Sequence, residues 1–351
     1  MKTLLYPIYL LGLGLMAAFL SGCDSLIYDE EGDCDPYHKV RFIFDYHLHP
    51  SDAFASEVGE VSLYVIDPET GEVVWSRHDD SPAVSSPGYL MDVDVKPGTY
   101  ELVAWCGPGH KTHFSVNESG GTSRESLTCR LVARDETAPA DDPHHLSTRI
   151  DHLYHGTLMA EEFTDKQGVH IHTVELKKNT NDVHIVLQHY RGKPVNPDDF
   201  IFTVSGANGH LDWDNSLLED DCISYHPWWT GTASAGVEQP DGTITPPGSS
   251  SLSKAQTMAS AAIADLRTSR LVKGNEVTIN VAKKDGSHVL SLPLIDFALM
   301  VKGQHRHLQD QEYLDRQDDY NLIFFLDDEG GWYRSHIYVN SYKVIIQGVE
   351  I

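Results

Sequence analysis

Histidine pairs are the residues of this sequence that most invite a chemical role. The chain has 20 histidines, and three pairs are separated by a single residue: His47/His49, His170/His172 and His305/His307. On a strand this spacing places both imidazoles on one face, which is half of a zinc site. No third ligand stands beside any pair, and a histidine-rich surface produces the same spacing. A zinc-dependent hydrolase is therefore a minor alternative, and we predict no bound metal.

Other patterns of catalytic residues do not complete a site. Neither HExxH nor GxSxG occurs in the chain, which removes the common zinc-protease and hydrolase signatures. Adjacent aspartates occur at 79–80, 141–142, 220–221 and 318–319. Paired carboxylates can cleave glycosidic bonds, but neighbouring residues on a strand face opposite ways, so solvated loop charge explains these pairs better. We predict no catalytic residues and no cofactor.

Cys23 is the one residue whose position predicts a specific modification. It ends a run that carries no charge from Thr3 onward, and Lys2 supplies a positive charge ahead of this run. That layout is typical of a secretory signal peptide. The sequence Leu-Ser-Gly-Cys that ends at Cys23 is also similar to the bacterial lipobox, in which the cysteine thiol takes a diacylglycerol before cleavage. We therefore predict a signal peptide over residues 1–22 and a lipid anchor at Cys23.

Two alternatives use the same N-terminal residues. About 20 apolar residues can span a bilayer as a helix, and a cleaved signal peptide can precede an unrelated cysteine. The tripeptide directly before Cys23 favours lipid attachment over both. Several acyl chains, each methylene contributing about 0.8 kcal/mol, hold a protein on a membrane almost permanently. The expected product is anchored to the membrane and does not span it.

Charge and cysteine content restrict the partners and the compartment. The formal net charge of −26 is spread along the chain, which repels nucleic acid and anionic lipid headgroups, so we exclude both as partners. After Cys23, four cysteines remain: Cys34, Cys106, Cys129 and Cys222. In an exported chain they permit disulfides in three possible pairings. Buried free thiols are an equal alternative for Cys106, which follows an apolar run.

Short runs rich in Val, Ile, Phe and Tyr predict strands along most of the chain. In the first half they cover 40–46, 61–66, 73–75, 90–95 and 99–105, with weaker runs at 127–133, 152–159 and 170–176. In the second half they cover 183–187, 200–204, 270–272, 277–281, 288–292, 320–326 and 337–346. One helix is expected at about 296–314, and 231–253 is expected to be a long loop. Many short strands between turn signals favour β-sandwiches.

The length favours two sandwiches over one. We predict a lipidated acidic tether over 23–38, an N-terminal β-sandwich over 39–176 and a C-terminal β-sandwich over 177–351. The polar segment 177–182 separates two strands, and we expect it to be accessible to proteases.

Several segments together resemble the fimbrillin-A-associated anchor family, the lipoproteins that hold type V fimbriae of Bacteroidales to the outer membrane. The most specific is QEYLDRQDDYN at 311–321, followed by 324–327, 337–342 and 344–346. Further matches are 40–42, 61–65, 97–100, 103–105, 208–209, 211–215 and 225–227. Ser341 and Tyr342 stand where the family pattern has Gly-Trp, which leaves the subgroup and the fimbrial partner open.

The resemblance implies two tandem transthyretin-like β-sandwich domains and a structural role rather than catalysis. It also implies attachment of a fimbrial shaft to the outer membrane at the cell surface, control of shaft length, and fimbrillin subunits as partners. Such subunits join by strand exchange. Tyr342, Val344 and Ile346 alternate onto one face of the last strand, which we predict to be the partner strand; the alternative is a core strand of the second sandwich. The rival function is a surface lipoprotein that binds a glycan or another nutrient through Trp228 and Trp229.

Overall fold

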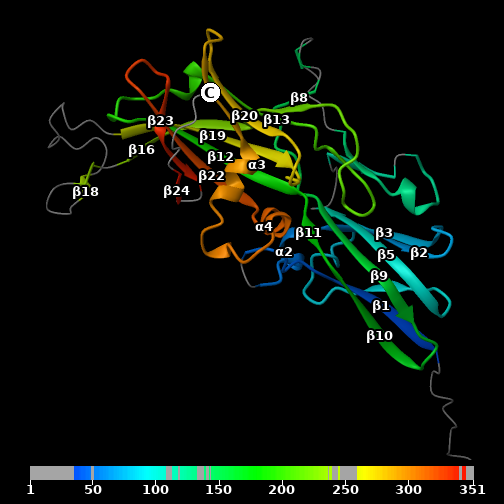
Figure 1. Cartoon of the computed structure of the whole chain (residues 1–351). Helices are drawn as coiled ribbons and strands as arrows, with labels where there is room; N and C mark the ends of the chain where they lie inside the picture. Colours follow the sequence, from blue (N-terminus) through cyan, green and yellow to red (C-terminus); the bar gives the residue numbers. More distant parts are fainter. Residues whose placement is uncertain are drawn as a thin grey trace, which may run out of the picture.

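The computed structural model of the 351-residue chain is almost entirely made of strands, as the sequence predicts. The structure describes residues 35–48, 51–107, 113–117, 119–132, 138–139, 142, 144–235, 237–238, 244–245, 259–339 and 342–344. Two β-sandwiches lie end to end, with short helices between them (Figure 1). The prediction of an all-β protein with two sandwiches is confirmed.

The first sandwich packs a three-stranded sheet on a five-stranded sheet. The smaller sheet has the order β10-β1-β4, with bounds Gly168–Glu175, Pro36–Ile43 and Met91–Val93. The larger sheet has the order β11-β9-β5-β2-β3, with bounds Lys177–Lys178, Tyr154–Phe163, Gly98–Gly107, Glu60–Ile66 and Val73–Asp79. Phe42, Leu63 and Leu102 are among the buried side chains between them. The short helix α2 (Phe54–Glu57) adds Phe54 to this core.

The second sandwich is larger. Its six-stranded sheet has the order β16-β19-β12-β22-β23-β24, with bounds Trp229–Ala235, Ala259–Ser269, Thr180–His189, Asp319–Leu326, Trp332–Val339 and Tyr342–Val344. Its five-stranded sheet has the order β21-β20-β13-β15-β8, with bounds His288–Pro293, Val277–Lys283, Phe200–Gly206, Ile223–Tyr225 and His145–Leu146. The helices α3 (Leu294–Met300) and α4 (Asp310–Arg316) pack against this unit.

Two further small sheets complete the described strands. One has the order β14-β7-β6, with bounds His210–Leu211, Cys129–Leu131 and Phe114–Val116. The other is the pair β17 (Val237–Glu238) and β18 (Ile244–Thr245). Short 3-10 turns occupy 124–126, 197–199 and 303–305. Because β8 pairs with β15, the first half of the chain contributes a strand to the second sandwich. β7 pairs with β14 in the small sheet.

Strand β5 shows why the larger sheet of the first sandwich is buried on both faces. Alternating side chains point to opposite sides of a strand, and Leu102, Ala104 and Cys106 belong to the core of the first sandwich. Val103 and Trp105 belong to the other buried cluster, which continues into the second sandwich. The Trp105 Nε1–H donates to the Leu127 carbonyl at 3.1 Å. The two units therefore share apolar contacts as well as a linking strand.

Several element boundaries differ from the sequence-based expectation. The expected helix at 296–314 is two helices: α3 ends at Met300, where Val301 leaves the helical conformation with φ −115° and ψ 33°, and α4 begins at Asp310. The expected strand at 270–272 is irregular, and the chain pairs just before it, in β19. The expected loop at 231–253 begins inside β16. The terminal run 337–346 contains two antiparallel strands, β23 and β24.

The two expected connecting segments are also more ordered than the sequence predicts. β1 begins at Pro36 and pairs with β10, so the last residues assigned to the tether 23–38 belong to the first sandwich. Lys178, Asn179, Thr180 and Asn181 are buried. The expectation that proteases reach 177–182 is therefore wrong, because the segment runs through the interior of the junction. The division of the chain at 176/177 stays a prediction.

No disulfide joins the described cysteines to one another. Cys106 and Cys129 are buried and Cys222 is exposed, so the buried-thiol alternative is correct for Cys106. Cys34 lies outside the described residues, as does Cys23. Within the part of the chain that the structure describes, no helix is both long and apolar enough to cross a membrane.

Candidate functional site: the junction of the two sandwiches and the edge strand β24

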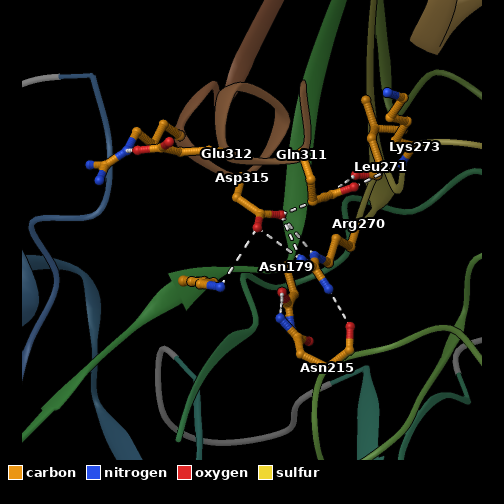
Figure 2. Close-up of polar contacts among 10 residues, drawn as sticks. Asn179, Asn215, Arg270, Leu271, Lys273, Gln311, Glu312 and Asp315 are labelled. Atoms are coloured by element: carbon orange, nitrogen blue, oxygen red, sulfur yellow. Dashed lines mark hydrogen bonds and ion pairs between the residues drawn. The ribbon is translucent and has the colours of Figure 1, made fainter. Parts of the chain in front are cut away.

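A single residue, Asn179, separates the last strand of the first sandwich from the first strand of the second. Its side chain forms a reciprocal amide pair with Asn215: the Asn179 Nδ2–H donates to Asn215 Oδ1 at 2.7 Å, and the Asn215 Nδ2–H donates to Asn179 Oδ1 at 3.0 Å (Figure 2). Asn215 has a φ of +71°, which asparagine tolerates better than most residues. Both side chains are buried. The pair holds the turn after β14 against the connecting strand.

A buried ion pair lies beside this amide pair. The Arg270 Nε–H donates to Asp315 Oδ1 at 2.9 Å, and its Nη2–H donates to both carboxylate oxygens at 2.7 and 2.9 Å (Figure 2). The Arg270 Nη1–H donates to the Asn215 carbonyl. Only 8% of Arg270 and 4% of Asp315 are exposed. This arrangement ties the end of β19 to helix α4 with charge-assisted bonds, the stronger class of hydrogen bond.

Further donors complete the surroundings of Asp315. The Gln311 Nε2–H donates to Asp315 Oδ1 at 2.8 Å and to the Leu271 carbonyl at 3.2 Å. The Lys177 ammonium, on β11 of the first sandwich, lies 3.8 Å from Asp315 Oδ2. One buried carboxylate thus contacts groups from both sandwiches. Its partners are hydrogen-bond donors and cations that hold elements together rather than activate a nucleophile.

Trp213, which follows β14, contacts two residues from the first half of the chain. The His155 side chain on β9 contacts the Trp213 carbonyl through Nε2 at 2.9 Å. The Arg124 guanidinium stacks 4.6 Å from the centre of the Trp213 ring, a cation–π contact. Burial lowers the pKa of His155 to about 3, although its bond to the Trp213 carbonyl opposes the shift. His155 is therefore a neutral structural group at ordinary pH.

A second set of charged residues lies at the start of β12, the strand that follows Asn179. The Arg267 guanidinium donates to both oxygens of Asp182, at 2.7 and 3.0 Å. The Lys178 ammonium lies 3.4 Å from Glu57 and 3.9 Å from Asp318. Burial raises the pKa of Asp318 to about 7, and the nearby charge of Lys178 only partly opposes this. Asp318 thus sits where its charged form is unfavourable.

Asp318→Asn should stabilise the protein at alkaline pH. The pKa of Asp318 in the folded state lies above its ordinary value of 3.8. Asp318 therefore does not reduce the stability below pH 3.8. The stability falls as pH rises from there through about 7, because the unfolded state loses the proton first. We expect the variant to gain on the order of 2 kcal/mol at pH 8 and little at pH 4, measured by urea unfolding. Asp319→Asn at the exposed neighbouring position is the control. Equal stability of wild type and Asp318→Asn at pH 8 would contradict the buried-charge argument.

The predicted partner strand lies at the edge of the larger sheet of the second sandwich. Tyr342 pairs with Val339 and Val344 pairs with Ile337, within β24. Among the described strands, β24 has a neighbour on one side only, because it is the last strand in the order of its sheet. Ile346, the third predicted residue, lies outside the described residues. An edge strand offers unpaired backbone groups to another chain.

The structure shows the surroundings of two of the three histidine pairs that suggested zinc. His172 contacts Glu161 through Nδ1 at 2.7 Å and His38 through Nε2 at 3.0 Å, whereas His170 contacts the Lys166 carbonyl. The rings of His305 and His307 lie 6.4 Å apart. His49 is outside the described residues. Among the described residues, none of these pairs is part of a group of three metal-ligating side chains.

Sequence reasoning identified part of the junction and missed the rest. The segment with the most specific resemblance, 311–321, includes helix α4 and supplies Gln311 and Asp315. Its partner Arg270 was assigned to a strand, and Asn179 to an accessible linker. Arg270 follows the polar residues 267–269, and such a position carries no sequence signal for its distant partner. Asn215 could be singled out from the sequence only because segment 211–215 resembles the anchor family.

Known proteins resemble this chain in sequence and in structure. The sequence model of the family described as "Fimbrillin-A associated anchor proteins Mfa1 and Mfa2" matches residues 30–348. The minor fimbrium anchoring subunit Mfa2 of Porphyromonas gingivalis is 21% identical over 209 residues, which are 59% of this chain and 61% of that protein. The chain thus matches less than two thirds of this curated relative.

Solved structures share the whole fold. A candidate adhesin from Bacteroides thetaiotaomicron is 31% identical with a TM-score of 0.75, and the match covers 90% of this chain and 99% of that one. A candidate polysaccharide-binding protein from the same species is 28% identical with a TM-score of 0.69, covering 89% and 99%. The fimbrial anchor protein Mfa2 from Porphyromonas gingivalis is 17% identical with a TM-score of 0.60, covering 89% and 99%, and shares the fold. With the family model matching most of its length, the chain belongs to the fimbrillin-A-associated anchor family.

Proposed function

We propose that this protein is a fimbrial anchor and assembly lipoprotein. It is held in the outer membrane at the cell surface by lipid at Cys23, joins a fimbrial subunit through its second sandwich and limits the length of the shaft. The observation that carries the proposal is the family match across residues 30–348, together with the lipobox that ends at Cys23. This family consists of structural proteins rather than enzymes.

The strand arrangement of the first sandwich suits a load-bearing role. β1 and β10 are parallel and pair from Pro36↔Gly168 to Ile43↔Glu175. A lipid tether pulls β1 from its N-terminal end, whereas the rest of the chain pulls β10 from its C-terminal end, which leads to β11 (Figure 1). Those forces act in opposite directions along the strands. The bonds of the ladder then share the load and must break together, which resists separation better than breaking one at a time.

The junction supports the same role. The linking strand is buried, and Asp315 contacts groups from both sandwiches. Charge-paired contacts of this kind keep the two units in a fixed relation, and an anchor needs that to transmit force from the membrane to the shaft. Strand exchange at β24 would supply the connection to the subunit, because main-chain bonds and alternating side chains join an added strand to a sheet edge.

Replacing Cys23 with alanine should remove the protein from the membrane. Without the thiol there is no site for the diacylglycerol, so the variant should accumulate in the soluble fraction or as an unprocessed precursor. Fractionation and immunoblotting of cells measure this, and pull-down of the wild type from native membranes should recover fimbrillin. Cys222→Ser, at an exposed thiol, is the control and should stay in the membrane. If Cys23→Ala is found at the size of the processed wild type and stays fully in the membrane, the lipid-anchor proposal is wrong.

A second candidate function is binding of a glycan, and one observation favours it. Trp228 and Trp229 are 36% and 45% exposed, and the Arg149 guanidinium stacks 4.7 Å from the centre of the Trp228 ring. Exposed aromatic faces suit sugar rings, and one similar structure is a candidate polysaccharide-binding protein. A glycan-array screen of the wild type and of a Trp228→Ala/Trp229→Ala variant tests this surface. If the wild type binds no polysaccharide, or if the variant binds it equally well, this surface is excluded as a glycan site.

A further inference from the structure

The pairing of two short strands places His145 and His226 side by side. β8 and β15 are parallel, with His145 opposite Ser224, and the His226 backbone N–H donates to the Leu146 carbonyl at 2.7 Å. Alternate residues of a strand share a face, so His145 and His226 point to the same side of the sheet. Leu146 and Tyr225 point to the other side, into the core. The two imidazole rings stack with centroids 3.9 Å apart.

A turn brings a carboxylate to the same place. The His145 backbone N–H donates to the Asp142 carbonyl at 3.1 Å, and this turn directs the Asp142 side chain toward the imidazoles. Asp142 Oδ2 lies 3.2 Å from His145 Nδ1 and 3.5 Å from His226 Nε2. The three ligand atoms all lie within 4.8 Å of one another. Asp142 and His145 are three residues apart, whereas His226 lies far along the sequence. None of them belongs to the three histidine pairs considered above.

We propose that Asp142, His145 and His226 form a binding site for a divalent transition metal, with zinc as the expected ion. Zinc takes imidazole and carboxylate ligands at about 2.0–2.1 Å in tetrahedral geometry, which puts neighbouring ligand atoms about 3.4 Å apart. The separations of Asp142 Oδ2 from His145 Nδ1 and from His226 Nε2, 3.2 and 3.5 Å, match that edge. Magnesium and calcium prefer oxygen ligands, so two imidazoles select against them.

The neighbours of the site fit this assignment. His226 Nδ1 lies 3.5 Å from Thr203 Oγ1 on the adjacent strand β13, and a polar partner on the second ring nitrogen orients a metal-ligating histidine. The side chains of Asp142, His145 and His226 are 29%, 22% and 16% exposed. Solvent therefore reaches the site, and the three protein ligands leave a fourth position for water or an exogenous ligand.

The consequence for the fold is a second link between distant parts of the chain. β8 comes from the first half of the sequence and sits at the edge of a sheet of the second sandwich. Its described strand is only two residues long, so few backbone bonds hold it there. A metal that bridges Asp142 and His145 to His226 would fix this edge strand. This inference does not depend on the proposed anchor function.

The test measures zinc itself. Full-length protein is purified in detergent, treated with a chelator, freed of it, and titrated with Zn²⁺ by calorimetry, with stoichiometry checked by elemental analysis. His184 is the matched control, because it pairs with Asp265 at 2.7 Å on the surface but belongs to no group of three ligands among the described residues. We expect wild type and His184→Ala to bind one zinc that His226→Ala lacks, and Asp142→Asn to bind it at least tenfold more weakly.

A thermal melt separates loss of the site from loss of the fold. Zinc should raise the melting temperature of wild type and of His184→Ala, because a ligand that binds the folded state stabilises it. Asp142→Asn keeps the size of the side chain, so its melting temperature without zinc should equal that of wild type, while the increase at the same zinc concentration should be smaller. If wild type, Asp142→Asn and His226→Ala bind the same number of zinc ions with the same affinity, the proposal is wrong.

Discussion

Arg270→Ala should destabilise the protein by about 3–5 kcal/mol, since removing one partner of a buried ion pair leaves the other charge uncompensated. Asp315 would lose three hydrogen bonds from the Arg270 guanidinium and keep only the Gln311 amide and the more distant Lys177 ammonium. The Asn215 carbonyl would also lose its donor. Urea unfolding, followed by tryptophan fluorescence and circular dichroism together, measures the change in the free energy of unfolding.

Two further variants separate the causes of this loss. Glu312→Gln removes the half-exposed pair that Arg316 forms with Glu312 at 3.1 Å on the same helix, and should cost less than about 1 kcal/mol. Arg270→Met combined with Asp315→Leu removes both buried charges and should recover part of the loss, because apolar residues can replace a buried pair. A loss below about 1 kcal/mol for Arg270→Ala would show that the ion pair does not hold the junction.

Arg270→Lys is the conservative comparison. Lysine keeps the charge but presents a single ammonium, which cannot reproduce the forked contact with both oxygens of Asp315 or reach the Asn215 carbonyl at the same time. We therefore expect an intermediate loss of stability. The junction connects the two sandwiches. The weakened variants should therefore unfold in two separate steps, whereas the two sandwiches of the wild type should unfold more nearly together.

The general fold was predictable because its strands carry local signals. β5 begins at the Pro-Gly turn at 97–98 and includes β-branched and aromatic residues such as Tyr100, Val103 and Trp105. The structure places it in the centre of its sheet. β19 was missed because its sequence, ASAAIADLRTS, contains mainly residues with low β-propensity. It is a strand because it pairs with β12 on one side and β16 on the other. Pairing partners far away in the sequence decide such a segment, and they leave no local pattern.

The same difference explains what could be predicted at the functional residues. The lipid site at Cys23 is a prediction from contiguous residues, and the 311–321 segment was identified from its resemblance to a family. The contacts of Arg270 with Asp315, and of Asn179 with Asn215, depend on how distant segments meet. The polar segment 177–182 was interpreted as accessible because charged and amide residues are mostly exposed. Its side chains are instead paired within the junction, as the Arg267–Asp182 contact shows, which composition cannot reveal.

Deletion of residues 342–351 should abolish co-purification with fimbrial subunits while the rest of the protein stays folded. β24 contributes three residue pairs to β23, and no other strand of the described ranges lies on its far side. The core of the second sandwich is built by other strands, among them β22 with the buried side chains of Tyr320, Leu322 and Phe324. Loss of one short edge strand should therefore leave the thermal transition in place, with a modest decrease in melting temperature.

A substitution makes this test independent of the deletion. Val344→Pro removes a backbone N–H and blocks pairing within a sheet, so it should also prevent co-purification. Val74→Pro, on β3 at the edge of the first sandwich, is the control and should leave co-purification unchanged. If the truncated protein unfolds completely, β24 is a structural strand of the second sandwich, as the alternative holds. If it stays folded and still retains the fimbrial subunit, the connection lies elsewhere, and β24 is not the partner strand.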